Sequence, residues 1–164
     1  MIDTHASRSP AAAAQAMRMA LALNPALDAV RADYVRTLLA LGDTARARPA
    51  FEPLRARARS DLRLAALAWA LDAAEATVGL DDEAPLRAAA EADPADPAAR
   101  LRLAQWRLAH GRWQAAMEAL LELVRIDRAW GDEAGRRGLL AAFELCGDAA
   151  LVRAYRRRLS AGLH

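Results

Sequence analysis

Residues 93–130 read DPADPAARLRLAQWRLAHGRWQAAMEALLELVRIDRAW, and this stretch decides the fold. Asp96 can cap a helix whose first residue is Pro97, where a missing backbone N–H costs nothing. Apolar residues recur at three- and four-residue spacing on both sides of residues 110–112, which is typical of amphipathic helices. Gly111 can end the first helix because glycine adopts the left-handed conformation cheaply. So short a connection makes the two helices antiparallel neighbours, and we predict a helical hairpin.

The same landmarks occur earlier in the chain. Pro25 precedes a helix that ends at Gly42, as Pro94 precedes the helix that ends at Gly111. The two prolines lie 69 residues apart (94 − 25), and so do the two glycines (111 − 42). This offset is two periods of about 34 residues with one extra residue, the period of the tetratricopeptide repeat. We therefore predict an all-α fold of antiparallel helical hairpins, stacked as a tetratricopeptide-like right-handed solenoid.

The repeat landmarks also predict how the chain is divided. We expect a disordered N-terminal stub over residues 1–8 and one repeat domain over residues 9–164. The domain would hold one partial repeat and four full repeats, at about residues 9–24, 28–61, 63–96, 97–130 and 131–164. The partial repeat is similar to the second helix of a hairpin, so the chain looks like part of a longer protein.

Two of the predicted helices carry weak local signals. Pro49 and Pro53 fall inside the helix expected over residues 45–57. A proline inside a helix costs about 3 kcal/mol, so we expect a kink or a late start there. The helix expected over residues 82–92 is short and its helical signals are weak.

Composition limits the class of protein. Hydrophobic residues make up 55% of the chain, many of them alanine, whereas aromatic residues make up only 5%. This balance favours closely packed helices over a sheet core. The longest apolar run, residues 64–71, is far too short to span a membrane, and the N-terminus lacks the pattern of a secretory signal. We therefore expect a cytoplasmic protein without a membrane partner.

All 23 basic residues are arginines, and their distribution is uneven. Residues 1–60 carry nine arginines and five acids, residues 61–99 carry two and nine, and residues 100–164 carry twelve and seven. An acidic middle between basic ends argues against a continuous nucleic-acid-binding stripe, so we expect no nucleic acid partner. The local cluster at Arg46–Arg59 is interpreted as a solvated helix face in preference to an RNA-binding patch, because no aromatic residues interleave for stacking.

The residue types needed for catalysis or metal binding do not occur in suitable patterns. His5, His110 and His164 are far apart in sequence, and Cys146 is the only cysteine. No set of histidine, cysteine and acidic residues has metal-binding spacing, and no glycine-rich loop could hold a phosphate. We therefore predict no catalytic, cofactor-binding or metal-binding residues and no enzymatic activity. His110 is assigned a structural role at the end of a helix, and Cys146 the role of a small, partly buried hydrophobe.

Helical repeats commonly bind partners along the inner faces of their first helices. The inner-face candidates here are Ala29, Ala32, Arg36, Leu39, Leu64, Leu67, Leu71, Ala74, Ala98, Leu101, Gln105 and Leu108. Only Arg36 and Gln105 are polar, so this face lacks the basic and amide residues of a carboxylate clamp. Two alternatives remain from sequence: an open apolar groove, or a face packed against the protein itself.

The C-terminal third has a more specific resemblance. The features that carry it are the turn at Gly111 with the apolar residues that follow, the connector RIDRAWGDEAGRR at residues 125–137, the helix end Phe143–Leu145, and the terminal run Tyr155–Leu159. This pattern resembles the C-terminal repeat domain of the bacterial chaperedoxins, closely over residues 93–163 and more loosely over residues 11–92. That family joins a thioredoxin-fold domain to tetratricopeptide-like repeats and acts as redox-protective co-chaperones of the chaperonin. The thioredoxin half is missing from this sequence, so the family's redox role cannot be carried by it.

The resemblance implies protein partners, namely the chaperonin and unfolded clients. The family's C-terminal helix is implicated in docking on the chaperonin, and the resemblance transfers this role to Tyr155, Arg156, Arg157, Leu159 and Leu163. The alternative is that Tyr155 and Leu159 cap the core while the arginines are solvated. Two other functions remain open: a generic tetratricopeptide scaffold in another assembly, or the non-catalytic half of a thiol oxidoreductase.

Overall fold

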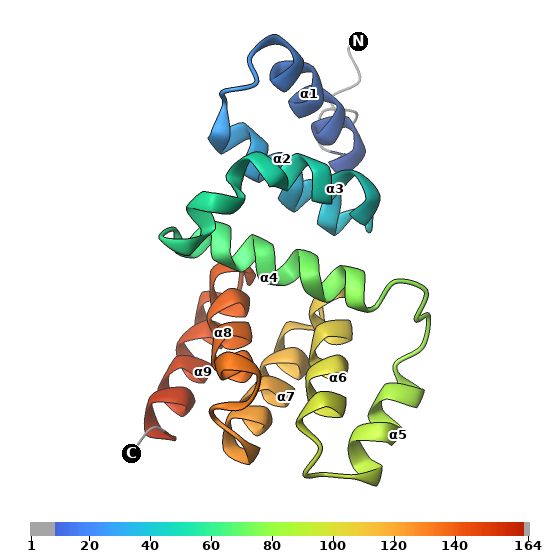
Figure 1. Ribbon diagram of the computed structural model, residues 1–164, viewed down its shortest axis with the longest axis vertical. Coiled ribbons are helices and arrows are strands. Elements are labelled where there is room, and N and C mark those ends of the chain that lie inside the picture. The colour runs from blue at the N-terminus through green and yellow to red at the C-terminus, as the bar shows by residue number, and fades with distance from the viewer. Residues whose placement is uncertain (1–8, 163–164) are drawn as a thin grey trace.

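The computed structural model describes residues 9–162, and every regular element among them is a helix (Figure 1). In chain order these are α1 (Pro10–Leu23), α2 (Asp28–Ala40), α3 (Thr44–Phe51), the 3₁₀ helix η2 (Glu52–Arg59), α4 (Leu62–Ala76), α5 (Ala84–Ala92), α6 (Pro97–Ala109), α7 (Trp113–Ile126), α8 (Trp130–Leu145) and α9 (Ala149–Ala161). The predicted all-α class of stacked helices is confirmed. The stub expected over residues 1–8 lies outside the described residues.

Local signals set the ends of the helices, as the sequence predicted. The side chain of Asp96 accepts a hydrogen bond from the amide of Ala98 at the start of α6, over 2.9 Å. Gly42 and Gly111 adopt the left-handed conformation, with φ of 73° and 68°, and follow the ends of α2 and α6. Each glycine lies in a short turn, so α2 packs against α3 and α6 packs against α7.

The two prolines change the type of helix. Pro49 lies inside α3, and Pro53 lies in the first turn of η2, where α-helical geometry gives way to a 3₁₀ helix at Glu52. A proline lacks the N–H that would continue the α-helical hydrogen bonds, so the helix predicted over residues 45–57 changes geometry part-way.

The predicted repeat 63–96 does not form a packed hairpin. Helix α5 packs mainly against α6, whereas α4 packs against α2, η2, α6 and α8 (Figure 1). Only Ala90 of α5 is buried, so this short helix has little apolar surface with which to hold a partner. Helix α4 has buried residues on several sides and therefore needs several neighbours.

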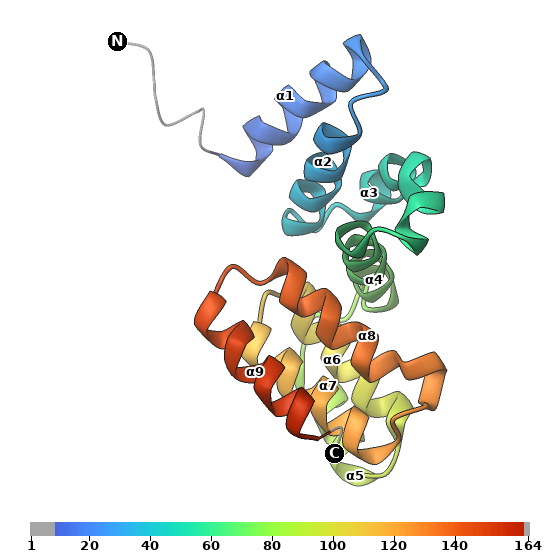
Figure 2. The same ribbon diagram turned by 90° about the vertical axis from the view of Figure 1, so that its left-hand side faces the viewer.

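Helix α4 joins two hydrophobic cores. Leu64, Leu67 and Leu71 of α4 belong to the core of the N-terminal half, formed with α1, α2 and α3. Ala70 and Ala73 belong to the core of the C-terminal half, formed with α6 to α9. Helix α8 packs against both α7 and α4, so α4, α6, α7 and α8 surround one shared interior (Figure 2).

Two glycines allow α8 to approach its neighbours closely. A Cβ atom at Gly138 would lie 2.6 Å from both Leu120 Cδ2 of α7 and Trp69 Cζ2 of α4. A Cβ atom at Gly135 would lie 3.1 Å from the carbonyl oxygen of Leu120 and 2.9 Å from Val124 Cγ2. Only a residue without a side chain fits at either position, and both glycines are buried.

The first turn of α8 is left-handed. Gly131, Asp132 and Glu133 have φ of 60°, 58° and 57°. A left-handed conformation costs about 1–2 kcal/mol for a residue with a side chain, so Asp132 and Glu133 are strained. The guanidinium of Arg137 stabilises this turn by donating to the carbonyl oxygens of Asp132 and Gly131, over 2.8 Å and 2.9 Å.

The packing of α8 leads to a stability prediction. Gly138→Ala should destabilise the fold by about 1–3 kcal/mol, because the added methyl group overlaps Leu120 and Trp69 and outweighs the higher helix propensity of alanine. Urea unfolding measures the change. Gly147→Ala is the matched control, since nothing lies within 4 Å of a Cβ at Gly147. Equal stability of the two variants would show that α8 does not need this close approach.

Candidate protein-binding surfaces

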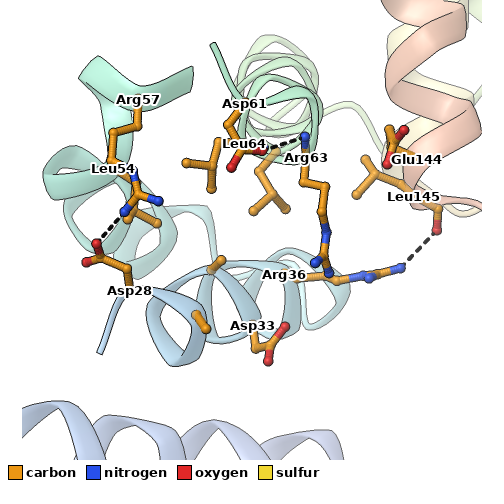
Figure 3. A pocket seen from close by; sticks show the side chains of 13 residues that line it. Asp28, Asp33, Arg36, Leu54, Arg57, Asp61, Arg63, Leu64, Glu144 and Leu145 are labelled. Atoms are coloured by element: carbon orange, nitrogen blue, oxygen red, sulfur yellow. Dashed lines mark hydrogen bonds and ion pairs between the residues drawn. The ribbon is translucent and has the colours of Figure 1, made fainter. Parts of the chain in front are cut away.

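A cavity of about 260 Å³ lies between α2, α4 and the end of α8 (Figure 3). Its apolar walls come from Ala29 and Ala32 of α2 and from Leu64 and Leu67 of α4, all predicted inner-face residues. Charged residues of both signs surround them: Asp28, Asp33, Arg36, Arg57, Asp61, Arg63 and Glu144. Sequence reasoning missed most of this charged ring, because its members come from four different elements.

A second cavity of about 590 Å³ continues along the same face, between α2, α4, α6 and the start of α7. Leu39, Ala74 and Leu108 line it, again as the inner-face prediction expected. Arg36, Leu67 and Leu145 line both cavities. The inner face is therefore neither fully open nor fully packed, because the end of α8 divides it into two parts.

Arg36 holds the end of α8 in this position. Its Nη2 donates to the carbonyl oxygen of Leu145 over 3.1 Å (Figure 3). Carbonyl groups in the last turn of a helix have no partner within the helix and carry partial negative charge, so a guanidinium stabilises them. Leu145 also packs against both hydrophobic cores. Arg36, predicted as a polar inner-face residue, thus ties α2 to α8.

A third hollow lies on the opposite face of α4 and is the largest of the three. This α4–α8–α9 groove has a volume of about 730 Å³ and also receives residues from η2. Its apolar part includes Leu62 and Trp69 of α4 with Leu140 and Phe143 of α8. Four arginines line it as well: Arg59, Arg136, Arg137 and Arg156. The sequence offered no direct signal for this groove, because its two walls lie far apart in the chain.

The predicted docking residues of the tail fall into two groups. Tyr155 and Leu159 are only 4% and 7% exposed and belong to the C-terminal core. Arg156 and Arg157 are exposed, and the guanidinium of Arg156 lies 5.4 Å from the ring centre of Phe143. Leu163 lies outside the described residues. The burial matches the alternative in which Tyr155 and Leu159 cap the core, and Leu159 also lines the α4–α8–α9 groove.

One carboxylate fastens α9 to α7. Glu118 of α7 accepts a hydrogen bond from the Tyr155 hydroxyl over 2.6 Å and two from the Arg158 guanidinium over 2.7 Å and 2.9 Å. The hydrogen bonds from Arg158, and to a lesser degree that from Tyr155, lower the pKa of Glu118 to about 2. Burial raises the pKa of Tyr155, and its hydrogen bond to Glu118 raises it further.

A second charged cluster fastens the segment before α5. Glu83 is buried between Arg107 and Arg112, with a 2.7 Å ion pair to Arg107. Burial alone would raise the pKa of Glu83, but the hydrogen bond and charge of Arg107 outweigh it and hold that pKa below its usual value. The Trp106 indole donates to the carbonyl of Leu80 over 2.8 Å. These groups satisfy one another, so the cluster has a structural role.

The other residues considered from the sequence, His110 and Cys146, occupy structural positions at the ends of α6 and α8. His110 stacks on Trp106 with 3.8 Å between the ring centres, and its Nδ1 lies 2.8 Å from the Trp106 carbonyl oxygen. Cys146 is half-buried at the end of α8. Within residues 9–162, no three histidine, cysteine or acidic side chains gather as metal ligands. None of the helices described is both long enough and apolar enough to cross a bilayer.

Comparison with known families assigns the fold. A family model described as tetratricopeptide repeat matches residues 76–164, from the last residue of α4 to the C-terminus. The chain belongs to the tetratricopeptide repeat family. A search of curated proteins and a search of solved structures each returned no match. Proteins of this family generally mediate protein–protein interactions through their helical surfaces.

The link between Arg36 and α8 can be tested directly. Arg36→Ala should lower the free energy of unfolding by about 0.3–1 kcal/mol and speed hydrogen exchange around residues 145–147, because the helix end loses its cationic partner. Chemical unfolding and exchange mass spectrometry measure these effects. Arg63→Ala is the control, since Arg63 lines the same cavity without contacting the carbonyl of Leu145. Identical behaviour of the two variants would contradict the role given to Arg36.

The lowered pKa of Glu118 predicts a pH dependence. The ionised carboxylate stabilises the fold above its ordinary pKa of 4.5, and this contribution is lost as the pH falls toward about 2. Wild type should therefore exceed Glu118→Gln in stability at neutral pH, and the difference should shrink over that acidic interval. Thermal unfolding at several pH values measures it. A difference that does not change with pH would contradict the ion pair with Arg158.

Proposed function

We propose that this chain is a non-enzymatic protein-interaction module. The proposal rests on the two cavities and the groove that lie on the two faces of α4, in a family whose members generally bind proteins. Concave, mainly apolar surfaces with a few polar groups are typical of binding sites. The described residues offer wide contact surfaces of this kind.

The finer proposal follows from the resemblance to the chaperedoxins. The chain would dock on the chaperonin and hold unfolded client proteins in the cytoplasm. In support of docking, α9 exposes Arg153, Arg156 and Arg157 along its outer surface. In support of client binding, the hollows on both faces of α4 offer apolar side chains. Tyr155 and Leu159 would hold α9 in place, and Leu159 also lines the α4–α8–α9 groove. The role given to Leu163 stays a prediction.

Two alternatives remain beside this proposal. A generic scaffold in another assembly would use the same surfaces with different partners. The non-catalytic half of a thiol oxidoreductase would need a thioredoxin-coding region in the same reading frame. Binding to purified chaperonin separates the first alternative from the proposal, because a generic scaffold has no affinity for it.

The docking test uses surface variants because removing residues 155–164 would also remove core side chains. We expect wild type to co-elute with purified chaperonin. The double variant Arg156→Glu, Arg157→Glu should bind about tenfold more weakly, since it replaces two exposed positive charges with negative ones. Size-exclusion chromatography and surface plasmon resonance measure the binding.

The control for this test is the double variant Arg18→Glu, Arg102→Glu, which makes the same charge change at exposed positions on α1 and α6. It should bind like wild type. If both double variants bind equally well, the docking role of α9 is wrong. If wild type does not bind the chaperonin at all, the chaperonin proposal fails and the generic scaffold remains.

A further inference from the structure

We propose that the α4–α8–α9 groove binds an acidic amphipathic segment of a partner protein, with the apolar side of the segment on the groove floor and its carboxylates on the arginine rim. This inference rests on the proposed function and adds the chemistry of the ligand. It concerns the outer face of α4, away from the inner face that was predicted from sequence to contact partners.

The groove floor exposes apolar side chains that the fold itself does not cover. Leu62 of α4 is 71% exposed and Leu140 of α8 is 36% exposed, and both line the groove. Half-buried Trp69 and the small residue Ala65 also line the groove. Leu62 and Leu140 come from separate helices and gather at one place, and such gathered apolar exposure marks an interaction surface. A volume of about 730 Å³ admits several side chains of a ligand.

The charges around this floor are mainly positive. Among the described residues, Arg59, Arg136 and Arg156 form no ion pair with an acid, and Arg137 donates to backbone carbonyls. Two acids also line the groove, Asp72 and Glu144. Asp72 forms a 2.7 Å ion pair with Arg48, and Arg48 does not line the groove.

This excess of positive charge selects the class of ligand. Guanidinium groups without an acidic partner gain most from carboxylates, which they can bind in bidentate fashion. An acidic ligand would be complementary to the rim, whereas a basic ligand would be repelled. The 260 Å³ cavity on the inner face differs, because its ring contains four acids and three arginines and favours neither sign.

The apolar floor indicates that the ligand of this groove is a protein segment and not a simple polyanion. Nucleic acids and acidic polymers without apolar side chains would contact only the arginines and leave Leu62 and Leu140 in water. An amphipathic helix places apolar residues at three- and four-residue spacing on one face and acids on the other, so it contacts floor and rim together. The ligand is therefore defined by both features at once.

The test measures binding of labelled peptides to the full chain by fluorescence anisotropy. The first peptide is an amphipathic helix of about 15 residues with leucines on one face and glutamates on the other. The second replaces every glutamate with lysine, and the third replaces every leucine with serine. Only the first should bind, and its binding should weaken between about 0.1 M and 1 M salt because the rim charges become screened.

Groove variants and matched controls locate the site. Leu140→Ser and Arg136→Glu should each weaken binding of the first peptide about tenfold. The controls are Leu23→Ser, at a leucine that is 89% exposed on α1, and Arg18→Glu on the same helix. Both controls should bind like wild type. Leu62→Ser is a second groove variant at a highly exposed position, and circular dichroism checks that each variant is folded.

Several results would overturn the inference. Equal binding of the lysine peptide would reject the acidic ligand, and equal binding of the leucine-free peptide would reduce the site to a polyanion contact. Binding unchanged by all three groove variants would place the site elsewhere. Failure of wild type to co-elute with the chaperonin, with peptide binding intact, would reject only the docking proposal. Chaperonin co-elution without any peptide binding would reject only this groove.

Discussion

The closeness of α8 to α4 and α7 is the constraint on which this structure depends. Gly138 lies where a single methyl group would overlap Trp69 on one side and Leu120 on the other. Because α8 fits into this space, its end reaches the inner face of the N-terminal half, where Leu145 meets Arg36. Both walls of the α4–α8–α9 groove, and the division of the inner face into two cavities, follow from that placement.

Much of the architecture could be predicted from local sequence signals. Capping residues such as Asp96 and left-handed glycines such as Gly111 act within one turn of a helix, so sequence reasoning finds the hairpin that they define. Packing between helices that are far apart in the chain does not depend on such local signals. The repeat landmarks around residues 63–96 predicted a hairpin. No local sequence signal indicates that α4 packs against α8 or that α5 packs mainly against α6.

The candidate surfaces were predicted less completely, for the same physical reason. The apolar inner-face residues follow from helical periodicity, and many of them line the two inner cavities. The outer groove joins α4 to helices more than sixty residues away (136 − 72), so no spacing in the sequence reveals it. Tyr155 and Leu159 illustrate the limit of resemblance alone, because a shared terminal pattern does not show that their side chains are buried in the core.

The packing of α8 against α4 affects how the protein unfolds and how it binds ligands. Open repeat arrays are quasi-one-dimensional, so their end units can melt while the middle stays intact. Here the chain closes a loop of contacts through α4, α6, α7 and α8, and α4 also belongs to the core of the first half. Melting should therefore be all-or-none across both halves. Since α4 forms a wall of every hollow described, any coupling between ligands bound on its two sides would change both affinities by the same factor.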